Sequence, residues 1–297
     1  MSRISRGGAV CVAALLQITL GAATTHAQGN GRGNAYGHVN RNVNSSAASG
    51  AAAVASEGGA IAGTGFRNFG SWLDDATLLD PGAGYVTLAL SYWRTPAFSE
   101  FDFPVMDGGI GVNRRVQFGM SAPYYHAHES GAPVVRGLGD VFLTAKIQLK
   151  EPSRGGAGFA ATPLVEVLSA PLPDGGGRVH WGIPVSMELQ REGWRLYAST
   201  GYFSRGAIFA SAAVEKAVTE NAWLTGTVSQ SHSMKSDELS FALGLSKNRT
   251  DVSGGVAMRI HPRAAIFGSV GRTISSEEGS AAPLMFTTGV SLSFAGK

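Results

Sequence analysis

Residues 179–190 read VHWGIPVSMELQ and alternate between apolar and other side chains. The apolar side chains occupy every odd position: Val179, Trp181, Ile183, Val185, Met187 and Leu189. Successive side chains of a strand point to opposite faces, so this period of two places all six on one face. Residues 140–150 repeat the pattern, and so do residues 284–294, where only Thr288 breaks it. These stretches predict long strands with one apolar face.

Alternating runs continue from Gly84 to the C-terminus, separated by turn residues. The runs are 84–95, 104–112, 114–125, 138–150, 157–169, 178–190, 193–203, 207–217, 221–231, 239–247, 250–260, 263–273 and 284–294. Bacterial single-chain barrels use an even number of strands, short periplasmic turns and longer outer loops. Short and long connections alternate consistently only if residues 239–247 belong to a long outer loop before the strand over 250–260. We therefore predict 12 strands, with ten or fourteen as alternatives.

The N-terminus has the parts of an export signal. Arg3 and Arg6 precede an apolar run over 9–23, and small residues lead to a cleavage site after Ala27. Cys11 lies within this run rather than after it, so it leaves with residues 1–27 and the mature chain has no cysteine. We expect cleavage of this signal peptide and export to the outer membrane of a Gram-negative bacterium.

Charge is sparse in this chain. Residues 1–27 hold two of the 24 basic residues and none of the 21 acidic ones, which leaves 22 against 21, a mature net charge of +1. Nucleic-acid binding is therefore not expected. Only 15% of residues are charged, against about 25% in soluble domains. A wall with one face in lipid excludes charge in this way, so we predict an all-β fold: a closed antiparallel up-and-down transmembrane β-barrel over residues 84–297.

Residues 28–83 precede the predicted barrel. Residues 28–65 are dominated by Gly, Asn, Ala and Ser, too poor in large apolar groups to offset the entropy of ordering. We interpret 28–83 as a flexible periplasmic leader. Its last part, 66–83, contains Phe66, Phe69, Trp72 and Leu73 and is either a short plug or an interfacial segment; the sequence leaves both open.

Polar side chains on the non-lipid face of the strands are candidates to line the barrel lumen. A charge facing lipid near the midplane costs about 2–4 kcal/mol, so these groups are expected inside. The candidates are Gln117, Lys146, Gln148, Lys150, Glu166, Glu188, Arg195 and Glu215. They would either fill a narrow lumen with ion pairs or set the selectivity of an open one. The outer-loop candidates are His126, His128, Asp140 and Asp174.

Two further hypotheses, a metal site and a hydrolase site, have less support than a channel lumen. His126, His128 and Glu129 have a spacing that a metal site could use, but no third scaffolded ligand is evident. His180, Ser186 and Glu188 supply the residue types of a hydrolase, yet six residues along a strand separate His180 and Ser186 by about 20 Å. We therefore expect no enzyme, no catalytic residue, no metal and no cofactor.

Several short motifs resemble those of outer-membrane barrels of the phenol-degradation meta-pathway type, a transporter-like bacterial family. They are Gly137-Leu138-Gly139-Asp140, Pro171-Leu172-Pro173-Asp174-Gly175-Gly176-Gly177, the strand pair over 253–272 and the last strand Gly289-Val290-Ser291-Leu292-Ser293-Phe294. The resemblance covers residues 84–297 and implies passage or binding of small, often hydrophobic, compounds. Here Ala295-Gly296-Lys297 follow Phe294, whereas family members commonly end on the aromatic residue.

We thus expect an outer-membrane barrel that passes or binds small solutes. Its partners would be outer-membrane lipid, the outer-membrane insertion machinery and a small-molecule solute, and we expect a monomer. One alternative is a non-transporting barrel with a structural or surface-interaction role. Another is a soluble exported β-sandwich, whose outward faces should carry more charge than residues 179–190 do.

Overall fold

The computed structural model describes 48–49, 65–68, 71–94, 98–129, 134–152, 156–169, 177–191, 193–204, 206–234, 248–276 and 284–294. These residues fall within one compact unit, 40–297. The predicted signal peptide over 1–27, most of the leader and Asp174 lie outside them. No helix in the described ranges is long and apolar enough to cross a membrane.

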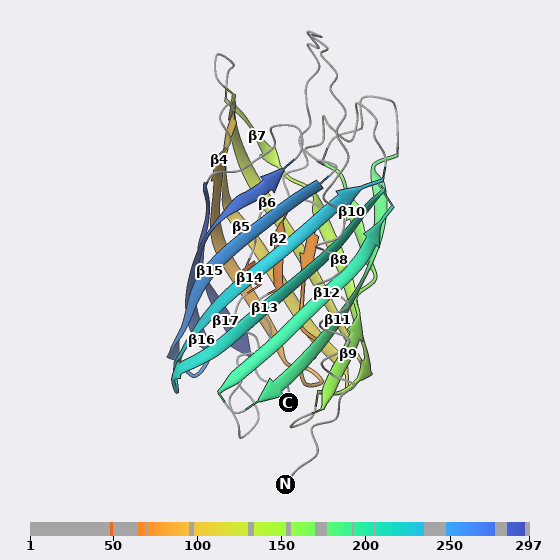
Figure 1. The fold of residues 1–297 in the computed structure, drawn as a ribbon, viewed down its shortest axis with the longest axis vertical. Coiled ribbons are helices and arrows are strands. Elements are labelled where there is room, and N and C mark those ends of the chain that lie inside the picture. The colour runs from red at the N-terminus through yellow and green to blue at the C-terminus, as the bar shows by residue number, and fades with distance from the viewer. Residues whose placement is uncertain are drawn as a thin grey trace. The chain divides into compact units, whose positions relative to one another are not determined.

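The strands described between Gly84 and Phe294 form one closed antiparallel sheet (Figure 1). Its strands are β4 (Gly84–Arg94), β5 (Phe98–Asn113), β6 (Val116–Glu129), β7 (Val135–Leu138), β8 (Val141–Lys150), β9 (Ala157–Ala161), β10 (Leu164–Val167), β11 (Val179–Arg191), β12 (Trp194–Phe203), β13 (Ala207–Thr219), β14 (Ala222–Ser233), β15 (Asn248–His261), β16 (Ala264–Ser276) and β17 (Leu284–Phe294). The last strand, β17, pairs along its length with the first, β4, from Gly84 opposite Phe294 to Arg94 opposite Leu284. This pairing closes the barrel.

Two of the twelve barrel strands are each interrupted once, so fourteen segments make twelve strands. β7 and β8 form one of them, separated by Gly139 and Asp140, and both pair with β6. β9 and β10 form the other, separated by Thr162 and Pro163, and both pair with β8 and β11. The register on β11 is the same on both sides of that gap. Pro163 has no N–H, which accounts for the local loss of ladder pairing.

The predicted count of twelve is confirmed, and most predicted boundaries agree within a few residues. The run 239–247 lies outside the described residues, but β14 pairs directly with β15, as the predicted exclusion of that run requires. Residues 98–103 are strand rather than loop, because β5 pairs there with both β4 and β6. A register shift between Asp102 and Val105 exchanges the inward and outward positions along β5. A search for strict period-two alternation therefore missed residues 98–103.

The two faces of the sheet differ in chemistry. Large apolar side chains on the outer face are exposed: Val86, Leu88, Phe118, Met120, Leu143, Ile183, Ile208, Val214, Leu224, Val256, Ile266 and Leu292. The alternate positions of the strands are buried on the inner face and are often small or polar: Thr87, Ser91, Ser121, Ser186, Ser199, Ser211, Ser229, Thr287 and Ser291. Inner apolar groups form small clusters, such as Ala89, Val105, Ala257 and Phe267. The exterior is therefore apolar and the interior largely polar, as in barrels that span membranes.

A second, three-stranded sheet precedes the barrel in sequence. It consists of β1 (Ala48–Ser49), β2 (Gly65–Asn68) and β3 (Ser71–Leu73). Strand β3 lies against β12, β13 and β14. The chain then runs through residues 74–83 to the start of β4.

A charge on the outer face should be costly if that face meets lipid. Leu88 lies midway along β4 with 43% of its surface exposed. We expect Leu88→Lys to lower the free energy of unfolding by about 2–4 kcal/mol in lipid vesicles, measured by urea titration. Asn221→Lys, in the exposed turn between β13 and β14, is the control and should change it little. Equal effects of both variants would contradict a lipid-facing exterior.

Candidate functional site

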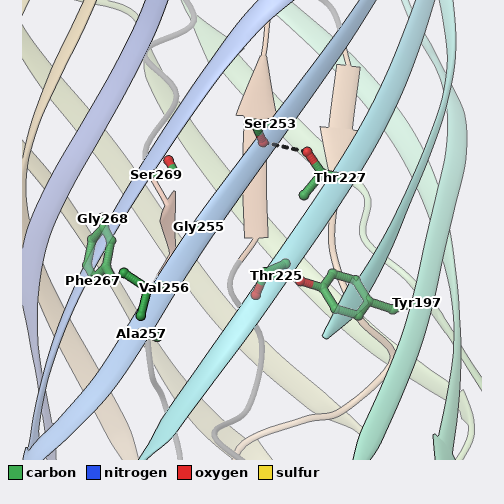
Figure 2. A pocket seen from close by; sticks show the side chains of 10 residues that line it. All are labelled: Tyr197, Thr225, Thr227, Ser253, Gly255, Val256, Ala257, Phe267, Gly268 and Ser269. Carbon is green, nitrogen blue, oxygen red and sulfur yellow. Dashed lines mark hydrogen bonds between the residues drawn. The ribbon is translucent and has the colours of Figure 1, made fainter. Parts of the chain in front are cut away.

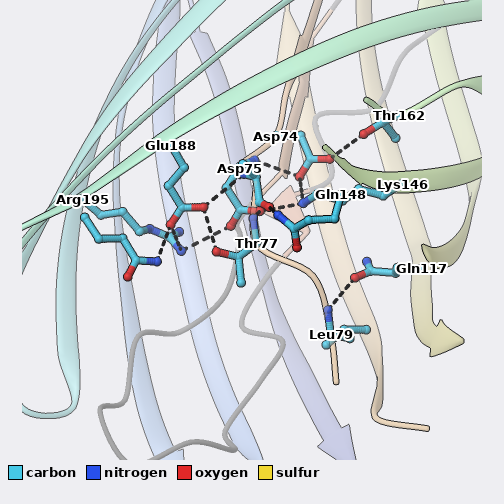
Figure 3. A network of polar contacts seen from close by, with 12 residues as sticks. Asp74, Asp75, Thr77, Leu79, Gln117, Lys146, Gln148, Thr162, Glu188 and Arg195 are labelled. Atoms are coloured by element: carbon cyan, nitrogen blue, oxygen red, sulfur yellow. Dashed lines mark hydrogen bonds and ion pairs between the residues drawn. The ribbon is translucent and has the colours of Figure 1, made fainter. Parts of the chain in front are cut away.

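The candidate site is the barrel interior, where residues 71–83 lie against the inner wall. We call these residues the inner segment. Figure 3 shows side chains of β6, β8, β11 and β12 converging on residues 74–79 of this segment. Five of the eight predicted lumen candidates make these contacts: Gln117, Lys146, Gln148, Glu188 and Arg195.

Ion pairs join the inner segment to the wall. Lys146 Nζ on β8 lies 2.6 Å from Asp75 Oδ1 and 3.0 Å from Asp74 Oδ1. Arg195 Nη1 on β12 lies 3.2 Å from Asp75 Oδ2 and 3.7 Å from Glu188 Oε1. Asp75 thus bridges two cations from different strands, and it is 1% exposed. Removing one member of such a buried pair leaves the partner charge uncompensated, so the network holds this part of the segment in one place.

Hydrogen bonds continue the contact along the segment. Glu188 on β11 accepts from the Ala76 N–H at 3.1 Å and from the Thr77 hydroxyl at 2.8 Å. Gln148 Nε2 donates to the Ala76 carbonyl at 2.6 Å. The Leu79 N–H donates to Gln117 Oε1 at 2.9 Å. The wall therefore satisfies backbone groups that an irregular segment would otherwise leave unpaired.

The end of the inner segment is fixed to strand β5 through backbone bonds. The Gly82 N–H donates to the Gly111 carbonyl at 2.7 Å, and the Gly111 N–H donates to the Ala83 carbonyl at 2.9 Å. A Cβ on Gly111 would lie 2.3 Å from the Asp80 carbonyl oxygen, so only glycine permits this approach. Gly82 itself has φ of 77°, in the left-handed region that glycine favours.

The start of the inner segment packs through an apolar contact. Leu73 is buried against Tyr197 of β12 and Ala213 of β13. The guanidinium of Arg195 lies 5.0 Å from the centre of the Tyr197 ring. The apolar contact of Leu73 therefore lies next to the ion pairs of Arg195 on β12.

Asp75 remains ionised at neutral pH in this setting. Burial raises the pKa of its carboxyl, but the Lys146 and Arg195 cations outweigh burial and hold that pKa below its ordinary value. Because the pKa is lowered, the attraction to Lys146 and Arg195 is present at neutral pH and is lost only on strong acidification.

The other three lumen candidates differ in position. Glu215 on β13 joins the network indirectly, with Oε1 3.3 Å from Arg195 Nε. Glu166 on β10 is 4% exposed and stands opposite Phe142 and His180 in the ladder. Lys150 is exposed at the end of β8, beyond a register shift, and its side chain is not part of the cluster.

The outer-loop prediction was wrong for His126 and His128. Both belong to β6, which extends to Glu129 because it pairs with residues 98–102 of β5 and with β7. The His126 ring lies among outer-face aromatic groups, 5.3 Å from Tyr124 and 6.1 Å from Phe101.

Asp140, also an outer-loop candidate, lies outside the strands. It is buried at the break between β7 and β8 and accepts a hydrogen bond from the Ser169 N–H at 2.9 Å. The fourth candidate, Asp174, lies outside the described residues.

The residue types of a hydrolase, His180, Ser186 and Glu188, all lie on β11. Ser186 is 1% exposed and stands opposite Ala160 and Ser199 in the ladder. His180 lies farther along β11, opposite Glu166. No group of three or more His, Cys, Asp or Glu residues suited to a metal ion occurs among the described residues.

Sequence reasoning missed Asp74 and Asp75, the centre of the network. The available signal was the pair of inward cations, Lys146 and Arg195, on strands that must exclude charge from lipid. Such cations require acidic partners inside. The adjacent aspartates at the end of a segment with plug-like composition were candidates for that role.

A hollow lies along β14, β15 and β16, with Tyr197 of β12 at its side (Figure 2). Its lining residues are Tyr197, Thr225, Thr227, Ser253, Gly255, Val256, Ala257, Phe267, Gly268 and Ser269. Thr227 and Ser253 hydrogen-bond to each other across β14 and β15. None of the lining residues carries a formal charge.

Comparison with known proteins supports the fold. The chain matches no protein-family profile and no curated protein. It is similar to the crystal structure of an outer-membrane channel from Pseudomonas putida F1, with a TM-score of 0.56 and 13% identity over 74% of this chain and 98% of that chain. It is also similar to the NanC porin, with a TM-score of 0.52 and 9% identity over 70% of this chain and 98% of that chain. The chain therefore shares its fold with outer-membrane channel and porin barrels.

Loss of the Asp75 charge should loosen the inner segment. Asp75→Asn weakens charge-assisted bonds to Lys146 and Arg195, each worth about 1.5–3 kcal/mol. We expect faster hydrogen–deuterium exchange at residues 73–79, measured by mass spectrometry. Asp80→Asn is the matched control, because the Asp80 side chain is exposed in the same segment. Unchanged exchange in Asp75→Asn would show that the ion pairs do not hold the segment.

Proposed function

We propose that this protein is an outer-membrane β-barrel channel that passes small solutes. The observation that carries the proposal is the closed twelve-stranded sheet with an apolar exterior and a polar interior. The similarity to outer-membrane channel and porin barrels supports it at the level of the fold.

The exterior supports a membrane location. Exposed side chains such as Val86, Phe118, Ile183, Leu224 and Val256 come from strands all around the barrel. Soluble monomers rarely expose continuous apolar areas of this extent. Outer-membrane lipid is the partner that would cover them, and export through the predicted signal peptide over 1–27 would precede insertion.

The inner segment acts as a plug that narrows the lumen. Its contacts engage Gln117, Lys146, Gln148, Glu188 and Arg195, so these lumen-lining groups hold the plug rather than face solute. Twelve-stranded barrels lie between the filled eight-stranded kind and the water-filled sixteen-stranded kind. A plug inside such a barrel restricts passage to small molecules.

Membership in the phenol-degradation meta-pathway family is the finer part of the proposal. The Gly137–Asp140 motif stands at the break between β7 and β8, where a Cβ on Gly139 would lie 2.7 Å from Pro123 Cγ. The last strand, with Phe294 at its end, is the segment that the insertion machinery would read. Membership would favour small hydrophobic solutes, and we propose that the protein acts as a monomer without cofactor or catalysis.

A specific observation favours a second candidate, a non-transporting barrel with a structural or surface-interaction role. The inner segment is buried and bonded at many points, as expected if the interior is filled for stability. The two candidates differ in whether solute crosses the barrel.

Conductance and flux separate these candidates. The purified protein should shift in gel mobility on boiling, as a detergent-resistant closed barrel does, and should give channel activity in planar bilayers. We expect Asp75→Asn to increase conductance, because a loosened plug widens the lumen. Glu220→Gln, in the exposed β13–β14 turn, should match the wild type. Absence of conductance and of solute flux in both the wild type and Asp75→Asn would favour the non-transporting barrel.

A further inference from the structure

Basic side chains form a row on the outer face of the barrel, at the end where the longer connections lie. Arg94 of β4 pairs with Ser99 of β5, which in turn pairs with His128 of β6. Paired residues of a sheet project from the same face, and Arg94 shares its face with the exposed Leu88 of the same strand. Arg94 and His128 are themselves exposed. Both therefore point outward, two strands apart.

Arg272 of β16 continues this row beyond β17. One residue before it, β16 pairs with Met285 of β17, so Arg272 lies level with Leu284. Leu284 is the partner of Arg94, which places the two arginines on either side of β17, about 10 Å apart. Arg272 is exposed, whereas the next residue, Thr273, is buried in the interior. Arg272 therefore also points outward.

Arg136 of β7 completes the basic set on the other side. It is exposed and pairs with His126 of β6, whose ring lies on the outer face beside Tyr124 and Phe101. From β16 to β7 the basic residues cover six neighbouring strands, or roughly 24 Å at the usual strand spacing. We call the following four residues the basic rim: Arg94, His128, Arg136 and Arg272.

No acidic side chain compensates the basic rim among the described residues. The acidic side chains described on these six strands, Glu100, Asp102 and Asp107, are buried on the inner face. None of the four side chains of the rim has a hydrogen bond or an ion pair with another described residue. At the opposite end of the barrel, by contrast, the exposed Glu151 and Glu220 accompany the basic residues of the short turns. The rim is therefore a surface of uncompensated positive charge.

Aromatic side chains lie one step nearer the middle of the wall on the same strands. Tyr92 precedes Arg94 by two residues on the same face, and it pairs with Phe286 on one side and with Phe101 on the other. Phe101 and Phe286 are 37% and 40% exposed. Aromatic rings on the lipid face of a barrel mark the depth of the lipid headgroups. The basic rim therefore stands at the outer edge of the headgroup layer, at the level of the lipid phosphates.

We infer that the basic rim binds a lipid of the outer leaflet whose headgroup carries phosphate groups. Guanidinium groups bind phosphate oxygens through paired, charge-assisted hydrogen bonds. The exposed apolar wall below them suits the acyl chains of the same molecule. Because the arginines are spread over roughly 24 Å, one phosphate cannot engage them all, and a headgroup with two or more is favoured. The inference rests on the membrane location in the proposed function but not on solute passage.

Native mass spectrometry of the detergent-solubilised protein tests the headgroup with two probes: lipid A, a glycolipid that carries two phosphates, and its monophosphorylated form. We expect the wild-type protein to bind the monophosphorylated form about tenfold more weakly, because at least one charge-assisted hydrogen bond is lost. Equal affinities would show that the acyl chains, and not the phosphates, determine binding, and would overturn the inference.

The triple variant Arg94→Gln/Arg136→Gln/Arg272→Gln tests the site, because it removes the charges and keeps polar side chains. We expect its affinity for lipid A to fall by about tenfold or more as the charge-assisted bonds are lost. Arg114→Gln/Arg263→Gln is the matched control, because both arginines are exposed in short turns at the opposite end, and it should bind lipid A like the wild type. Equal losses in the two variants would indicate general electrostatic attraction and would overturn the site.

The heat-dependent shift in gel mobility checks that each barrel has closed. If the triple variant does not close, Arg94→Gln/Arg272→Gln takes its place and should also weaken the binding of lipid A. Wild-type affinity in a closed variant would overturn the site while leaving the channel function intact. Displacement of lipid A by an equal concentration of inorganic phosphate would assign the arginines to free phosphate and overturn the lipid assignment. Recovery of the wild type from the soluble periplasm, without a shift, would instead overturn the membrane location on which the inference rests.

Discussion

The structure depends on the pairing of β17 with β4. Backbone N–H and C=O groups that face a bilayer find no water, so each must be bonded within the protein, and a sheet achieves this only by closing. Eleven residue pairs, from Gly84 with Phe294 to Arg94 with Leu284, complete that closure. Once the wall is closed, its two faces meet different surroundings, and the period-two sequence follows directly. Outward positions become apolar and inward positions become polar. Charged side chains are restricted to inward positions, where side chains of opposite charge can compensate them.

Closure of the barrel creates a second requirement, because charged side chains that point inward must be compensated within the interior. The solution is asymmetric. Lys146, Glu188 and Arg195 are compensated by one another and by the inner segment, whereas the hollow along β14–β16 is lined by hydroxyls, glycines and the rings of Phe267 and of Tyr197 from β12. The residues that attract most attention in the sequence, the inward charges, thus position a segment.

The barrel could be predicted from sequence because its signal is repeated in every strand, so single ambiguities, such as residues 239–247, were resolved by the alternation of short turns and long loops. The failures arise where a local irregularity breaks the period. The register shift near Pro104 concealed the extension of β5, and Pro163 divided one predicted strand into two segments. The network around Asp75 could not be predicted from the sequence for a different reason. Its partners are 71 and 120 residues away, and no periodic pattern specifies which inward cation meets which acid.

Those separations bear on how the molecule is assembled. The inner segment precedes every barrel strand in the chain, yet its ion pairs require β8 and β12, and its hydrogen bonds to Glu188 require β11. A closed wall has no lateral opening, so the segment is either surrounded by the strands as they come together or threaded in afterwards through one end. The backbone bonds of Gly111 to Gly82 and Ala83 favour the first order, because they tie the segment to β5, the second barrel strand in the chain. The buried aspartates would then form their ion pairs late in assembly. Slow hydrogen exchange around them would therefore indicate a fully assembled barrel.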